Sequence, residues 1–102
     1  MRAGVIEIIF NSYGSSHAEN SYIVFFVPDQ RASIPIRMRQ LSGLEALKEF
    51  LLGLDIPEAK MNAALASVPR LRVASIPNVT LSNDQLEKFN LSWGEQGKPR
   101  EN

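Results

Sequence analysis

The stretch YIVFFV at residues 22–27 is apolar at every position and is the strongest signal of buried structure in the chain. Side chains of a β-strand point alternately to opposite faces, so this run predicts a central strand that is covered on both faces. Residues 5–10 are rich in β-branched side chains and residues 34–38 alternate, so both segments also predict strands. Asn, Ser, Gly and Glu collect in residues 11–21, which predicts a loop.

Three helices are predicted from their start signals. Capping-box patterns begin at Ser42, Asp55 and Ser82, each with a Glu or Gln three residues later. The second helix is expected to run to about residue 68, because Pro69 cannot continue it. Residues 70–73 then alternate between arginine and apolar side chains and predict a fourth strand, followed by a turn at residues 77–78.

The resulting order, β-β-β-α-α-β-α, predicts one compact α+β domain over residues 1–93. Its expected form has two layers, a mainly antiparallel sheet of about four strands and helices packed on one face of that sheet. The pattern leaves open where the fourth strand enters the sheet. Trp93 is expected to pack just beyond the last helix, and residues 94–102 contain no apolar side chain, which predicts a disordered tail.

The composition excludes several kinds of chemistry. The chain has no cysteine, so it has no disulfide, no thiolate nucleophile and no cysteine-based metal site. Lys and Arg together number 11, as do Asp and Glu, so net charge does not draw the protein to nucleic acid or to a membrane. Glycine-rich phosphate-binding motifs and His-x-x-His spacing are absent, so neither a cofactor nor a metal is expected. The N-terminus resembles neither a signal peptide nor a membrane span, which predicts a cytoplasmic protein.

The long first loop holds the weak catalytic candidates Tyr13, Ser15, Ser16 and His17. These residue types include nucleophiles and a base, so a small hydrolase or transferase is one hypothesis. Catalysis needs a geometry that one polar loop does not specify, so the sequence favours a protein that is not an enzyme.

The arginines suggest a different kind of function. In the predicted third strand Ile34, Ile36 and Met38 are expected to face the core, so Arg37 and Arg39 would point outward. The predicted fourth strand repeats this pattern, and the arginines concerned are Arg70 and Arg72.

If both strands share one sheet, all four guanidinium groups emerge on its open side. The leading hypothesis is therefore a protein-interaction or adaptor module, with a protein partner or as a homodimer, that binds through this face. Two alternatives stay open: nucleic-acid or other anion binding by the same face, with Tyr22 or Phe26 as a stacking platform, and arginines that are merely solvated. The surplus of apolar residues in the central strand can be covered by a second copy, by a partner, or by loops and the Trp93 region of the same chain.

Overall fold

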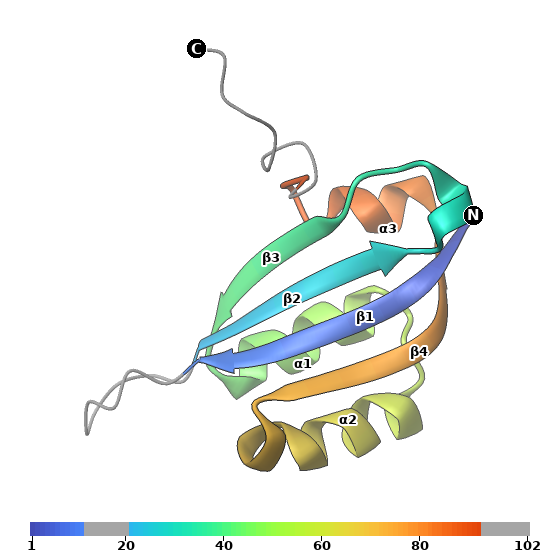
Figure 1. Ribbon diagram of the computed structural model, residues 1–102. Coiled ribbons are helices and arrows are strands. Elements are labelled where there is room, and N and C mark those ends of the chain that lie inside the picture. The colour runs from blue at the N-terminus through green and yellow to red at the C-terminus, as the bar shows by residue number, and fades with distance from the viewer. Residues whose placement is uncertain (12–20, 93–102) are drawn as a thin grey trace.

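The computed structural model describes residues 1–11 and 21–92 of the chain (Figure 1). The sheet is built from β1 (Arg2–Asn11), β2 (Ser21–Pro28), β3 (Arg37–Ser42) and β4 (Val73–Leu81). The helices are α1 (Leu44–Gly53), α2 (Glu58–Leu71) and α3 (Asn83–Glu87), with a short 3₁₀ turn η1 (Gln30–Ala32) between β2 and β3. The predicted α+β class and order of elements are confirmed.

All neighbouring strands are antiparallel, and their spatial order is β3-β2-β1-β4. The first three strands therefore form a meander. The fourth strand, whose position the sequence left open, pairs with the free side of β1 after the chain has passed through α1 and α2. Figure 1 shows the helices on one side of the sheet, with α1 behind the strands and α2 close to β4.

The core lies between this sheet and the helices. On the sheet side it contains Ile6, Ile8, Val24 and Phe26, which alternate along β1 and β2 and have no exposed surface. The helices contribute Leu47, Leu51, Met61, Ala64, Val68 and Leu86, and Phe89 follows just after α3. The opposite side chains of β1 and β2 are only half-buried. Alternation in these two strands thus separates a helix-covered face from an open one.

The third strand begins later than predicted. Residues 34–36 are outside any strand, and β3 starts at Arg37 and continues to Ser42, which pairs with Ser21. Pro35 has no N–H to donate to a ladder, which explains why pairing begins only after it. Because Ser42 belongs to the strand, the predicted capping box there is wrong, and Gly43 with a φ of +89° precedes α1 instead.

The predicted end of the second helix is also wrong, as is the position predicted for the fourth strand, residues 70–73. The helix α2 continues through Pro69 to Leu71, and the N–H of Arg72 closes it by donating to the Val68 carbonyl over 2.8 Å. Burial of Val68 in this last turn holds the helix against the sheet. The fourth strand begins only at Val73.

The other two helix starts differ from each other. The second predicted capping box fails, because Pro57 is the N-cap of α2 and Asp55 has a positive φ of 63°. The third is confirmed: Ser82 Oγ accepts from the N–H of Gln85 over 3.2 Å, and Gln85 Oε1 accepts from the N–H of Ser82 over 2.7 Å. Gln85 also donates to the Leu54 carbonyl, which ties α3 to the end of α1.

The predicted turn at residues 77–78 is instead an irregularity inside β4. Gly4 pairs with Val79 and Ile6 with Ile76, so one residue of β1 lies opposite two of β4. Asn78 adopts a left-handed conformation with a φ of 58°. Such a bulge bends an edge strand while its pairing continues on either side.

Candidate functional site

The four arginines proposed from the sequence do not share a surface. The β2–β3 register pairs Arg37 with Phe26 and Arg39 with Val24, and both partners are fully buried beneath the helices. Arg37 and Arg39 therefore lie on the helix-covered face, contrary to the prediction. Moving a strand by one residue relative to its neighbour transfers every side chain to the opposite face of the sheet. Met38, which was expected to face the core, pairs with Phe25 and lies on the side of the sheet away from the helices.

The other two arginines are not in a strand. Arg70 is in the last turn of α2, and Arg72 is the left-handed residue that ends this helix, with a φ of 68°. Both are exposed. The basic sheet face that the sequence predicted therefore does not exist, and the nucleic-acid alternative loses the arrangement on which it depended.

Arg37 and Arg39 instead contact the end of α3. Arg37 Nη1 donates to the Leu86 carbonyl over 3.5 Å, and Arg39 Nη1 donates to the Lys88 carbonyl over 2.9 Å. Carbonyl groups at a helix C-terminus lack partners within the helix and carry partial negative charge, which attracts cations. The two arginines thus hold α3 against β3; both are half-buried, and Nε of Arg37 is buried with no hydrogen-bond partner among the described residues.

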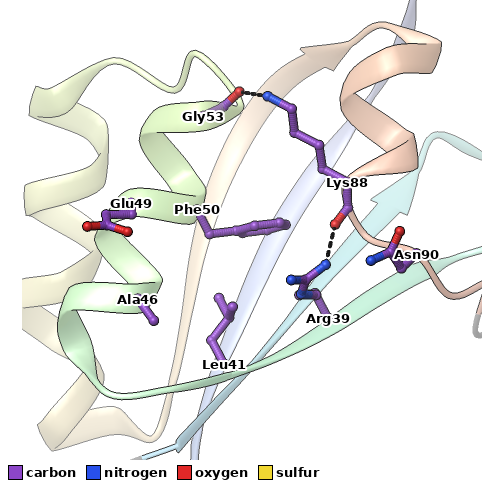
Figure 2. Close-up of a pocket in the computed structure, with 8 residues that line it drawn as sticks. All are labelled: Arg39, Leu41, Ala46, Glu49, Phe50, Gly53, Lys88 and Asn90. Carbon is purple, nitrogen blue, oxygen red and sulfur yellow. Dashed lines mark hydrogen bonds between the residues drawn. The ribbon is translucent and has the colours of Figure 1, made fainter.

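Arg39 also forms one wall of a cleft between α1 and α3, which lies over β3 (Figure 2). The cleft has a volume of about 460 Å³, and its lining consists of Arg39, Leu41, Ala46, Glu49, Phe50, Gly53, Lys88 and Asn90. The guanidinium carbon of Arg39 lies 5.7 Å from the centre of the Phe50 ring, a cation–π distance. Phe50 in turn meets the buried Phe89 ring edge to face, with centroids 5.0 Å apart.

Hydrogen bonds fix the basic end of this cleft. Lys88 Nζ donates to the Gly53 carbonyl at the end of α1, so a single lysine bridges the two helices. One orientation of the Asn90 side-chain amide forms hydrogen bonds with both neighbouring groups. In it, Oδ1 accepts from Arg39 Nη1 over 2.7 Å and the amide nitrogen donates to the Glu87 carbonyl over 2.9 Å. These hydrogen bonds hold Arg39 and Lys88 in fixed positions at the same end of the cleft.

The second candidate surface is the side of the sheet that faces away from the helices, here called the open face. It consists of Val5, Glu7, Ile9, Ile23, Phe25, Val27, Met38, Gln40, Val73 and Ser75, which pair with one another across all four strands. Most are half-buried, and Val73 is 45% exposed. Glu7 is the one charged side chain in this set. No helix of the described residues covers this face (Figure 1).

The two edges of the sheet are poorly suited to pairing with a strand from another molecule. On β4, Pro77 cannot donate to a new strand, and the bulge at Asn78 bends the edge. On β3, Ser92 pairs with Arg37, and the N–H of Met38 donates to the Leu91 carbonyl over 3.0 Å. Pairing with a strand from another molecule is therefore disfavoured at β4. At β3, Leu91 and Ser92 of the same chain already occupy part of the edge.

The loop candidates Tyr13, Ser15, Ser16 and His17 lie outside the described residues, as do Trp93 and the tail at 94–102. Within residues 1–11 and 21–92, no group of three or more His, Cys, Asp or Glu side chains is placed to hold a metal ion. No helix in the same residues is long and apolar enough to cross a membrane.

Sequence reasoning missed the cleft altogether. Its residues come from three separate elements, and only Arg39 was singled out, for a different face. Lys88 and Asn90 follow α3, and Phe50 belongs to α1. Nothing in these local patterns indicates that the elements meet.

Comparison with known proteins adds no assignment. The chain matches no protein-family model, and no curated protein and no solved structure is significantly similar to it.

Proposed function

We propose that this protein is an interaction module that forms a homodimer through its open face. The observation that carries the proposal is the patch of apolar side chains, contributed by all four strands, on the side of the sheet that no helix of the described residues covers. Ile9 and Ile23 lie directly opposite each other, with Val73 beyond Ile9, and the Glu7–Phe25 pair separates them from the Val5–Val27 pair further along the strands. A contiguous apolar surface of this kind on a water-soluble domain marks an interaction site.

The size of the open face supports a dimer of modest affinity. Four strands about 4.8 Å apart, paired over six to eight residues, present a face of at most roughly 20 by 25 Å. Two such faces in contact would bury about 1,000 Å² in total, which is below the roughly 1,200–2,000 Å² of stable complexes and is typical of weak ones. The expected dimer therefore dissociates on dilution.

A second copy is the occupant that fits this face best. Two twisted sheets with apolar faces pack about 10 Å apart, and a two-fold axis brings the same patch of each together. The face presents no cation to attract an acidic partner, and Glu7 is a single carboxylate among apolar neighbours. Recognition would thus depend on apolar shape, which two identical faces supply to each other.

The test is the solution mass by light scattering across a wide range of protein concentration. We expect the mass to rise from monomer to dimer. The double variant Ile9→Thr, Ile23→Thr keeps β-branched residues in the strands and removes apolar area, so it should remain monomeric with an unchanged circular dichroism spectrum. Leu52→Gln is the matched control: Leu52 is 48% exposed on α1, away from the open face, and its loss should leave the dimer intact.

A third variant reports on the position of the interface. Dimerisation through the open face would remove water from the Glu7 carboxylate, which disfavours association. Glu7→Gln should therefore tighten the dimer. A wild-type protein that stays monomeric at every concentration would refute the proposal and indicate that the chain covers its own sheet. A dimer that is insensitive to both Thr substitutions and to Glu7→Gln would place the interface elsewhere.

A further inference from the structure

We infer that the cleft between α1 and α3 is a binding site for a small organic carboxylate with an apolar body. This site lies on the opposite side of the sheet from the open face and does not depend on dimerisation. Its volume of about 460 Å³ lies within the range of known small-molecule sites.

The geometry of Arg39 selects the anionic group. Its Nη1 is already engaged by the Lys88 carbonyl and by Asn90. The remaining nitrogens, Nε and Nη2, have no hydrogen-bond partner among the described residues. Figure 2 shows the guanidinium edge that is turned away from Lys88 facing the space beside Phe50 and Leu41. Two parallel N–H groups on one edge match the two oxygens of a carboxylate.

The apolar part of the ligand has a matching surface next to this edge. The Phe50 ring, the buried Leu41 side chain and the half-buried Ala46 lie together on the side of the cleft away from Lys88 (Figure 2). An aromatic or branched aliphatic group attached to the carboxylate would replace water there. The small side chain of Ala46 leaves the room that such a group needs.

Charge distribution favours one negative charge over two. Arg39 and Lys88 lie at one end, and Glu49 is the one acid in the described lining of the cleft. Figure 2 shows Glu49 on α1, away from the two basic side chains. A monocarboxylate can approach Arg39 and keep its apolar end toward α1, whereas an elongated ligand with a second carboxylate at that end would meet Glu49. Sulfate has no apolar body to replace water beside Phe50 and Leu41, so it should bind less well.

The probe is phenylacetate, followed by two-dimensional ¹⁵N–¹H NMR of the full chain. We expect saturable shifts of the backbone signals of Arg39, Ala46, Phe50 and Asn90. Phenylacetamide has the same shape without the charge and should bind about tenfold more weakly or less, because it loses the charged hydrogen bonds to Arg39. Sulfate should not produce the same pattern.

Two variants of α1 test the cleft without disturbing the arginine that holds α3. Ala46→Leu keeps a good helix former and fills the apolar end, so phenylacetate affinity should fall about tenfold. Glu49→Gln removes the opposing charge at an exposed position and should raise affinity about twofold to fivefold. No saturable shift, equal binding of the amide or of sulfate, or shifts that map away from the cleft would each overturn the proposal.

Discussion

Gly4 provides a test of whether packing or backbone entropy decides the effect of a substitution in this sheet. The residue is buried in β1 between Pro28 of β2 and Val79 of β4. In the interior of a strand, replacing glycine by alanine usually stabilises a protein by about 0.5–1 kcal/mol, because the unfolded chain loses freedom. At Gly4, a Cβ atom would lie 2.8 Å from the Phe26 ring and 2.8 Å from the Pro28 Cα, and would collide with the Val27 carbonyl oxygen.

Two of these three atoms belong to the backbone of β2, so they cannot move away without opening the β1–β2 ladder. Overpacking of this kind lowers the free energy of unfolding by about 1–3 kcal/mol, which exceeds the entropic gain. Gly4→Ala should therefore be less stable than the wild type by about 1–2 kcal/mol in total. In a domain of this size, each kcal/mol corresponds to roughly 4–8 °C in Tm.

Gly53→Ala is the matched control, measured in the same way by urea unfolding followed by circular dichroism. Gly53 is helical, and its new Cβ would meet only the flexible end of Lys88, with Nζ at 3.6 Å. This variant should be stabilised by about 0.5–1 kcal/mol. If Gly4→Ala proved as stable as the wild type at an unchanged denaturant slope, the close approach of β1 and β2 would not constrain this position, and the reasoning would fail.

Three further measurements follow from the structure. Ser82→Ala should lower the free energy of unfolding by about 1 kcal/mol, because it removes the cap of α3, whereas Ser75→Ala on the exposed side of β4 should change it little in the same urea assay. Arg72→Gly should raise the free energy of unfolding by about 1 kcal/mol, because glycine adopts the left-handed conformation at this helix end without strain, and a lower urea midpoint would contradict this. Burial raises the pKa of the Tyr22 phenol above its ordinary value of 10.0, so the unfolded chain ionises at lower pH than the folded one. The contribution of the Tyr22 phenol to the free energy of unfolding is complete below the pKa of the unfolded chain. It is lost as the pH rises through the higher pKa of the folded protein. Urea midpoints of the wild type should therefore fall between about pH 9 and about pH 11 more than those of Tyr22→Phe.

The sequence by itself determined the local character of most elements. β-Branching at residues 5–10 and the unbroken apolar run at residues 22–27 identified the first two strands, since the backbone preference and the pattern of burial agree there. The cap at Ser82 was also predictable, because a capping box involves atoms only three residues apart. The apolar run at residues 22–27 correctly predicted a strand inside the sheet, but no helix of the described residues covers its second face, where Ile23, Phe25 and Val27 are half-buried.

Only the tertiary structure decided what depends on contacts between distant segments. Residues 70–73 alternate like a strand, but burial of Val68 against the sheet extends α2 to Leu71. The face of Arg37 and Arg39 depends on the register of β3 with β2, and a register one residue away would have placed them as predicted. The cleft exists because these arginines bind the end of α3 while Lys88 reaches the end of α1. Local patterns record which conformation a segment prefers, whereas register and helix docking are set by interactions between segments that are far apart in the chain.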